Sequence, residues 1–307
     1  MPKPPLPSSD GTAPVAVTPV PTDVPAPARP AGVPRLPETP FDLLDQATCD
    51  FYLRSLDLLD QAGVPYLVGG AYSLAYHAGI VRHTKDLDVF VRAAHAPGVL
   101  QMYKEHGYRT ALTFPHWLGK AFDPQDETTF VDVIYGSGNG LCPVDDDWFA
   151  HAVSGMVLGR PAQLVPAEEV IWTKSFICER ERFDGGDVNH LIHARGRTLD
   201  WPRLVRRFKG HERMLLAHLL MYGYAYPGER DAVPAEVLRE VFDRAHAEPP
   251  VPRGTDAAKV CMGTFISREQ YLVDVHQRGY EDARLQPRGP MREQDVKHWT
   301  DAIGTIK

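Results

Sequence analysis

Between residues 41 and 165 the hydrophobic positions follow two alternating patterns. In residues 41–62 apolar side chains recur every three to five positions, and Gly63 follows, which predicts a helix with a defined end. Short runs of β-branched and aromatic residues predict strands. The predicted strands are residues 66–68, 86–91, 110–114, 118–122 and 128–135, and a helix is predicted at 96–107. We therefore expect an α/β region of roughly 125 residues.

From Pro166 onward the pattern becomes helical. Before it, a short helix is expected at 145–153 and a strand pair or loop at 157–165. Apolar spacing then predicts helices at 166–178, 188–194, 201–224, 233–247 and 267–279. We expect three parts: a disordered Pro-rich tail at 1–40, an α/β (α+β) catalytic domain at 41–165, and a mainly helical C-terminal region at 166–307.

Composition narrows the class of protein. The chain has 307 residues, 43% of them hydrophobic, which is enough for a real core. A net charge of -7 carries no global signature of nucleic-acid or membrane binding. Four scattered cysteines form no CxxC pair, which favours free thiols in a reducing compartment. The sequence shows no apolar run of about 18 residues and no secretory signal, so we expect a cytoplasmic protein without a membrane partner.

The most informative stretch is residues 68–91, VGGAYSLAYHAGIVRHTKDLDVFV. Gly69 and Gly70 lie at a strand-to-helix turn, where glycines allow close approach to a ligand and a helix N-terminus favours anions. Asp86 and Asp88 are two positions apart on a strand and share a face, with Cα atoms about 6.6 Å apart. A phosphate-binding turn beside paired carboxylates indicates phosphoryl or nucleotidyl transfer.

Asp132 is the candidate for a third metal ligand. It lies in the middle of the predicted strand TTFVDVIY, between apolar neighbours. A carboxylate is costly to bury there unless it is paired or binds a metal. Three carboxylates can hold two metal ions, and Mg²⁺ prefers oxygen ligands. Asp132 could also accept the proton of an attacking hydroxyl.

Each candidate residue of this stretch, and of the segments after it, also has a structural interpretation. Gly69-Gly70 can be only a tight turn, and an Asp-x-Asp pair can be a solvated strand end or the metal-diphosphate motif of a glycosyltransferase. Arg82 and Thr84 can make local contacts only, Lys174 can be an exposed helix lysine, and Asp187 can be a helix N-cap. The basic residues between 195 and 213 can guide an RNA acceptor or form a solvated helix face.

Together the residues resemble the nucleotidyltransferase superfamily, which shares the fold of DNA polymerase beta. The resemblance rests on Gly-Gly, then RHTKDLD, then a later strand with a central Asp, and it is greatest to small bacterial minimal and toxin-type members. The superfamily commonly has Gly-Ser in place of Gly69-Gly70. In residues 166–191 the resemblance places a nucleotide-binding Lys at Lys174 and an Asp at Asp187. It covers roughly residues 41–196.

This resemblance implies a mixed sheet with flanking helices and a Mg²⁺- or Mn²⁺-dependent enzyme. The enzyme would transfer a nucleoside monophosphate from an NTP such as ATP to an acceptor hydroxyl on a small molecule, RNA or protein. Asp86, Asp88 and Asp132 would be the catalytic and metal-binding residues. The nucleotide would contact Gly69, Gly70, Arg82, Thr84, Lys174 and Asp187. The alternatives are a toxin-like enzyme that modifies tRNA or protein, and a non-catalytic nucleotide-binding module of the same fold.

Overall fold

The computed structural model describes residues 44–82, 84, 86–286 and 289–302. The predicted Pro-rich tail lies outside these residues. The helices are α1 Gln46–Gln61, α2 Gly70–Ala78, α3 Ala96–Glu105, α4 Asp146–Ala150, α5 Ala167–Lys174, α6 Gly185–Arg195, α7 Trp201–Arg207, α8 Glu212–Ala225, α9 Ala235–Ala247, α10 Leu272–Gln277 and α11 Glu293–Asp301. The strands are β1 Leu67–Val68, β2 Asp86–Phe90, β3 Arg109–Phe114, β4 Leu118–Phe122, β5 Phe130–Ile134, β6 Val153–Val157, β7 Arg160–Leu164, β8 Val260–Cys261 and β9 Glu281–Asp282.

In the described part of the chain, strands β1 to β7 form one mixed sheet in the order β3-β4-β5-β2-β1-β7-β6. The central strands β2 and β5 run parallel, while β1 is antiparallel to β2 and parallel to β7. Hairpins add β3, β4 and β6 at the edges. This arrangement confirms the predicted mixed α/β fold, and it puts the polar positions of β2 beside those of β5.

One face of the sheet is covered by α1 and α3. Leu87, Val89, Val131 and Val133 pack with apolar side chains of these helices and are fully buried. Because side chains alternate along a strand, the positions between them point to the opposite face. One face of β2 and β5 therefore packs in the core, and the other carries Asp86, Asp88 and Asp132 beside Phe90 and Ile134.

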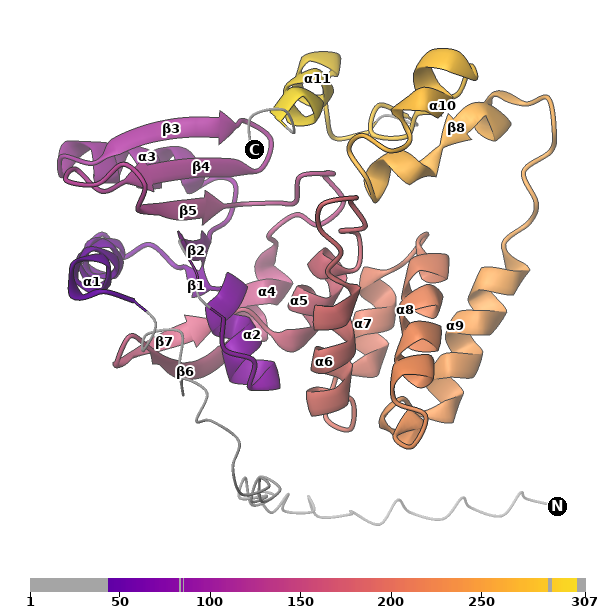
Figure 1. Ribbon diagram of the computed structural model, residues 1–307, viewed down its shortest axis with the longest axis horizontal. Coiled ribbons are helices and arrows are strands. Elements are labelled where there is room, and N and C mark those ends of the chain that lie inside the picture. The colour runs from indigo at the N-terminus through magenta and orange to yellow at the C-terminus, as the bar shows by residue number, and fades with distance from the viewer. Residues whose placement is uncertain (1–43, 83, 85, 287–288, 303–307) are drawn as a thin grey trace, which may run out of the picture. The chain divides into compact units, whose positions relative to one another are not determined.

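The second core connects the sheet to the helices that follow it. Leu67 and Trp148 belong to the same buried cluster as Ile171, Leu191 and Leu215. Helix α6 contacts both α2 and α8, and α8 lies beside α9 (Figure 1). Secondary structure changes near residue 165 as expected, but the core is continuous across that point, so the predicted domain boundary stays a prediction.

Three helical predictions were wrong in extent. The helix predicted at 166–178 ends at Lys174. The run 201–224 is two helices, α7 and α8, because Gly210 adopts a φ of 80° between them. The last predicted helix, 267–279, is only α10, Leu272–Gln277. None of the helices in the described residues combines the length and apolar character needed to cross a bilayer.

The C-terminal segment contains a helix that the sequence reading missed, α11. Trp299 on α11 packs edge-on against Phe114 and Trp117, with ring centroids 4.9 and 5.3 Å apart. His298 lies 2.7 Å from the carbonyl oxygen of Thr113. The polar composition of α11 hid it, because few of its side chains are buried.

Candidate active site

The three predicted carboxylates lie together on the polar face of the sheet. Asp88 on β2 pairs directly with Asp132 on β5, and Lys120 on β4 pairs with Asp132 on the other side. Side chains at paired positions of neighbouring strands project from the same face. Oxygen atoms of Asp86, Asp88 and Asp132 all lie within 4.8 Å of one another.

The electrostatics of this cluster are unfavourable when it is considered alone. Burial, and then the charges of Asp86 and Asp132, raise the pKa of Asp88 well above its usual range. Burial also raises the pKa of Asp132 to about 6, although Lys120 opposes the shift. The ammonium of Lys120 is 2.6 Å from Asp132 Oδ1. One lysine therefore offsets only part of the negative charge of three carboxylates.

This donor set fits a divalent cation of the Mg²⁺ type. All three groups supply carboxylate oxygens, the ligands that hard cations prefer. Thr84 steadies the first of them, because its hydroxyl donates to Asp86 Oδ1 at 2.7 Å. The residual negative charge is what a cation would neutralise. Asp86, Asp88 and Asp132 are thus the residues that would hold the metal.

Glycine is required at positions 69 and 70, because the backbone there lies too close to β2 to leave room for a Cβ. The amide of Gly69 donates to the carbonyl of Asp88 at 3.0 Å. Gly70 begins α2 with a φ of 54°, and a Cβ built there would lie 1.7 Å from Asp88 Oδ2. A Cβ at Gly69 would lie 2.2 Å from the ring of Phe90. The N-terminus of α2 therefore lies directly against the carboxylate cluster.

The structure brings three predicted nucleotide-binding residues into one cluster of charges. Lys174, at the end of α5, donates to Asp187 Oδ2 at 2.8 Å and to Asp184 Oδ2 at 2.7 Å. Arg82 forms an ion pair with Asp187. Asp187 lies inside the first turn of α6, and Asp184 holds the N-cap position, so the N-cap interpretation of Asp187 was wrong. The substrate roles of these residues stay predictions.

Sequence reasoning missed two members of this cluster, Arg182 and Asp184. Arg182 donates to both oxygens of Asp184, at 2.8 and 2.7 Å. The Asp184-x-x-Asp187 spacing was a usable signal, since positions three apart share one side of a helix start.

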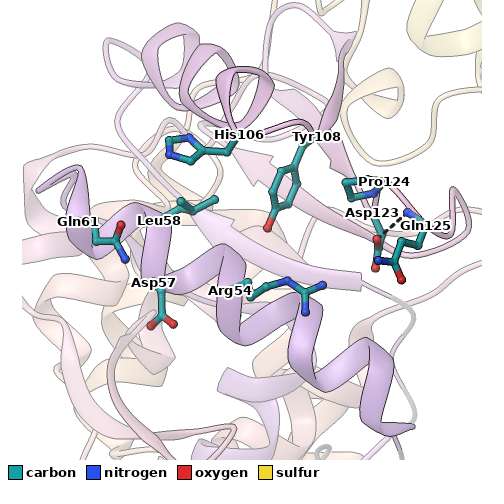
Figure 2. A pocket seen from close by; sticks show the side chains of 9 residues that line it. All are labelled: Arg54, Asp57, Leu58, Gln61, His106, Tyr108, Asp123, Pro124 and Gln125. Atoms are coloured by element: carbon teal, nitrogen blue, oxygen red, sulfur yellow. Dashed lines mark hydrogen bonds between the residues drawn. The ribbon is translucent and has the colours of Figure 1, made fainter.

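One pocket on the surface is not lined by the carboxylates. That pocket, of about 410 Å³, lies beside α1 and is lined by Arg54, Asp57, Leu58, Gln61, His106, Tyr108, Asp123, Pro124 and Gln125 (Figure 2). It opens on the side of the sheet that α1 and α3 cover. We place the site at the carboxylates, because oxygen atoms of all three converge within 4.8 Å of one another and burial raises the pKa of two of them.

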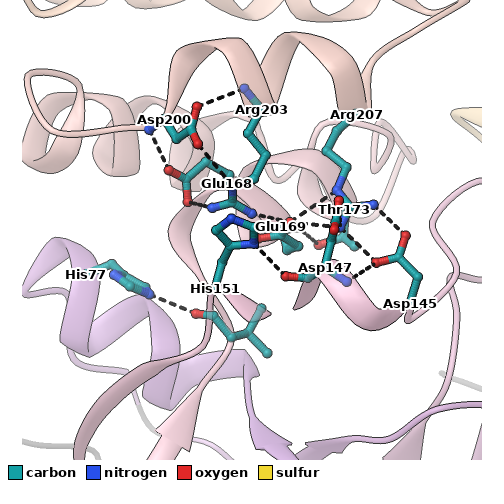
Figure 3. Close-up of polar contacts among 11 residues, drawn as sticks. His77, Asp145, Asp147, His151, Glu168, Glu169, Thr173, Asp200, Arg203 and Arg207 are labelled. Carbon is teal, nitrogen blue, oxygen red and sulfur yellow. Dashed lines mark hydrogen bonds and ion pairs between the residues drawn. The ribbon is translucent and has the colours of Figure 1, made fainter. Parts of the chain in front are cut away.

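The basic stretch between 195 and 213 is largely occupied by internal contacts. Arg203 is 3% exposed and donates to Glu168 and Glu169 at 2.5 Å each (Figure 3). Arg207 binds Asp145 at 2.6 and 2.9 Å and also reaches Glu169. Neither predicted use of this stretch, as an RNA guide or as a solvated face, applies to Arg203 and Arg207, since the guanidinium groups of both are buried among carboxylates.

His77 also has a structural role. Its Nε2 lies 2.8 Å from the carbonyl oxygen of Val165, and the side chain is buried. Burial lowers the pKa of His77, which keeps the ring neutral near pH 7. The ring therefore joins the end of α2 to Val165, the residue after β7.

One family of known proteins matches the part of the chain that carries the first two carboxylates. The family model of aminoglycoside-2''-adenylyltransferases matches residues 53–120, which include Gly69, Gly70, Asp86 and Asp88. The fold is that of the nucleotidyltransferase superfamily. The match confirms the predicted superfamily and the reaction class of the enzyme, although it covers less than half of the chain and ends before Asp132.

Solved structures give distant likenesses. The lincosamide antibiotic adenylyltransferase LnuA is 18% identical, over 48% of this chain and 96% of its own, with a TM-score of 0.35. ANT(2")-Ia in complex with adenylyl-2"-tobramycin is 16% identical, over 66% and 100%, with a TM-score of 0.34. A nucleotidyltransferase-like protein from Paracoccidioides brasiliensis is 13% identical, over 62% and 93%, with a TM-score of 0.38. No curated protein matches the chain.

Proposed function

We propose that this nucleotidyltransferase moves a nucleoside monophosphate from an NTP to a hydroxyl of a small polyhydroxylated antibiotic of the aminoglycoside type. The observation that carries the reaction is the placement of Asp86, Asp88 and Asp132 on one face of two parallel strands, within 4.8 Å. The acceptor class follows from the family model that matches residues 53–120. ATP is the proposed donor for the same reason.

Each residue has a distinct part in this proposal. Asp86 and Asp88 would hold the divalent cation, which when bound neutralises negative charge on the transferring phosphoryl group. Asp132 would complete the metal site and take the proton from the attacking hydroxyl. Lys120 keeps that carboxylate oriented, with the ammonium 2.6 Å from Asp132 Oδ1.

The turn at Gly69 and Gly70 would admit the triphosphate close to the backbone. The N-terminus of α2 presents unpaired amide groups there, and the helix dipole favours an anion. Lys174 has three N–H donors and uses two of them on Asp184 and Asp187, so one remains for a phosphate oxygen. These groups would bind the nucleotide and orient its α-phosphate.

The proposal is tested by transfer assays with labelled ATP. Purified protein, Mg²⁺ and α-³²P-ATP are incubated with an aminoglycoside panel, a lincosamide, total RNA or a protein extract. We expect label on an aminoglycoside and release of pyrophosphate in equal amount. Label on RNA or protein instead would overturn the acceptor class and favour the toxin-like alternative. ATP binding without pyrophosphate release from any acceptor would favour the non-catalytic module.

A further inference from the structure

The loop between α5 and α6 turns back on itself beside the carboxylate cluster. Cys178 and Phe183 form an antiparallel bridge, and the amide of Glu179 donates to the carbonyl of Arg182 at 2.9 Å. This turn places Arg182 next to Asp184 and Lys174. The loop is therefore a built structure with a defined position for Arg182.

The guanidinium of Arg182 is held rigidly and is still open to solvent. Its Nε and Nη2 donate to the two oxygens of Asp184, which is buried. The Arg182 side chain itself is 62% exposed. A guanidinium has five N–H donors, and these two bonds leave three, including both on Nη1. A planar donor group fixed in this way matches the geometry of a phosphate.

The charges around Arg182 are not balanced. Asp184 and Asp187 supply two negative charges, whereas Arg82, Lys174 and Arg182 supply three positive ones. The excess lies near the carboxylate cluster, because the guanidinium of Arg182, which Asp184 holds, interacts electrostatically with Asp88. Arg182 thus acts electrostatically on the metal-binding face. A cationic rim next to a metal site suits a polyphosphate.

A second set of contacts anchors the loop to the C-terminal segment. Glu179 accepts from Arg268 Nε at 2.8 Å and from the hydroxyl of Ser267 at 2.8 Å. The amide of Cys178 donates to the carbonyl of Ile266 at 2.9 Å. The Glu179 and Arg268 side chains are only 11% and 15% exposed. Residues 266–268, for which the sequence predicted no function, therefore hold the loop that carries Arg182 in place.

We propose that Arg182 binds the β- and γ-phosphates of the NTP, and that the Glu179–Arg268 ion pair positions it. This inference rests on the proposed function. In nucleotidyl transfer the acceptor oxygen forms a bond to the α-phosphorus and loses its proton to Asp132. The bond from the α-phosphorus to the bridging oxygen breaks, and pyrophosphate leaves with that electron pair. Arg182 stabilises the charge that develops on the leaving pyrophosphate.

The first test compares ligands that have and lack the outer phosphates. Binding of Mg²⁺-pyrophosphate, Mg²⁺-ATP and AMP is measured by calorimetry for wild type, Arg182→Ala and Arg180→Ala. Arg180 is an exposed cation on the same loop and serves as the matched control. We expect Arg182→Ala to weaken pyrophosphate and ATP binding roughly 10- to 100-fold. AMP binding should not change, and Arg180→Ala should resemble wild type.

The outcomes separate the two proposals. If wild type binds neither pyrophosphate nor ATP and transfers no label, the proposed function falls and this inference falls with it. If wild type binds and turns over ATP, but Arg182→Ala binds pyrophosphate equally well, only the inference is overturned. An equal loss of AMP and ATP binding would also overturn it, because that pattern indicates a purely structural role for Arg182.

The positioning role is tested by a double-mutant cycle. Glu179→Gln should weaken ATP binding roughly 3- to 10-fold in the wild-type background, and it should have no further effect in the Arg182→Ala background. Thermal unfolding of each variant checks that the loop change does not unfold the protein. Additive losses of ATP binding in the double variant would show that Glu179 does not act through Arg182.

Discussion

Two clusters of buried carboxylates in this molecule differ in how their charge is compensated. Glu168 and Glu169 on α5 are 7% and 0% exposed, and Arg203 and Arg207 pair with them from α7 (Figure 3). On the sheet, Asp132 forms an ion pair with Lys120, whereas Asp88 has no ion pair among the described residues and interacts with Arg182 and Lys174 only electrostatically. Both clusters are expensive to desolvate, yet only the first is neutralised by groups of the chain itself.

The difference separates a structural ion network from a candidate site. In the first cluster two guanidinium groups pair with two buried glutamates and join α5 to α7, and Arg207 also reaches Asp145 at the N-cap of α4. A cluster whose carboxylates repel one another gains stability only when a cation or a proton arrives. Burial of acidic residues is therefore not informative by itself; the deficit of positive charge around them is.

Replacing Asp88 by Asn should have the largest functional effect. It removes a proposed metal ligand, and we expect turnover to fall on the order of 10³-fold or more. Ionised Asp88 is unfavourable in the metal-free protein, because burial raises its pKa. In EDTA the thermal unfolding temperature of the Asp88→Asn variant should therefore equal or exceed that of wild type. The measurements are labelled-ATP transfer and a thermal melt. A folded Asp88→Asn variant with wild-type turnover would contradict the assignment of the active site to these carboxylates.

Replacing Arg203 by Met should have the opposite profile. It leaves Glu168 and Glu169 with too little positive charge, and we expect the free energy of unfolding to fall by about 3–5 kcal/mol. The control is Arg197→Met, which removes an exposed ion pair with Asp231 and should leave the free energy of unfolding close to that of wild type. Urea denaturation measures both. Equal losses would mean that the buried network contributes no more than a surface pair.

Substitutions of the two glycines at the ends of α2 separate the effect of backbone strain from the effect of a side chain that collides with Asp88. Gly70 and Gly79 both have positive φ, at 54° and 67°, so alanine at either should cost about 1–2 kcal/mol of stability. Only the Cβ at Gly70 would collide with Asp88; the Cβ at Gly79 meets nothing within 4 Å. Gly70→Ala should therefore lower turnover about 10²-fold, while Gly79→Ala keeps it. A similar loss of turnover in both variants would attribute the effect to strain.

The sequence was sufficient for the parts of the site that follow from strand periodicity. Asp86, Asp88 and Asp132 share a face because side chains alternate along β2 and β5, and the pairing of Asp88 with Asp132 needs only that these strands be neighbours. Lys120 was not found, because it enters through the register of β4, which no local pattern fixes.

The remaining features depend on contacts between distant segments. Arg182 gains its position from Arg268, which is 86 residues later in the sequence, and Arg203 finds its partners on another helix. Apolar spacing carries no information about which cation a carboxylate will meet. It also gave α7 and α8 as one helix, since the apolar residues of both keep helical spacing through Gly210.

The smallest expected effect is a difference in the response to acid. His218 is buried on α8, with Nε2 2.9 Å from the carbonyl of Ser175, and burial lowers its pKa from 6.5. The folded state therefore favours the neutral ring, and its contribution to stability is present above pH 6.5 and lost as the pH falls below that value. The carboxylates respond in the opposite direction: because burial raises the pKa of Asp132 to about 6, the metal-free protein gains stability as the pH falls from 6 toward 4.

Replacing His218 by Gln should abolish the loss of stability below pH 6.5. The slope of the free energy of unfolding against pH should then change by at most about 1.4 kcal/mol per pH unit. Urea denaturation in EDTA between pH 7 and pH 5 measures the slope, and identical slopes for His218→Gln and wild type would show that the buried histidine does not titrate on unfolding.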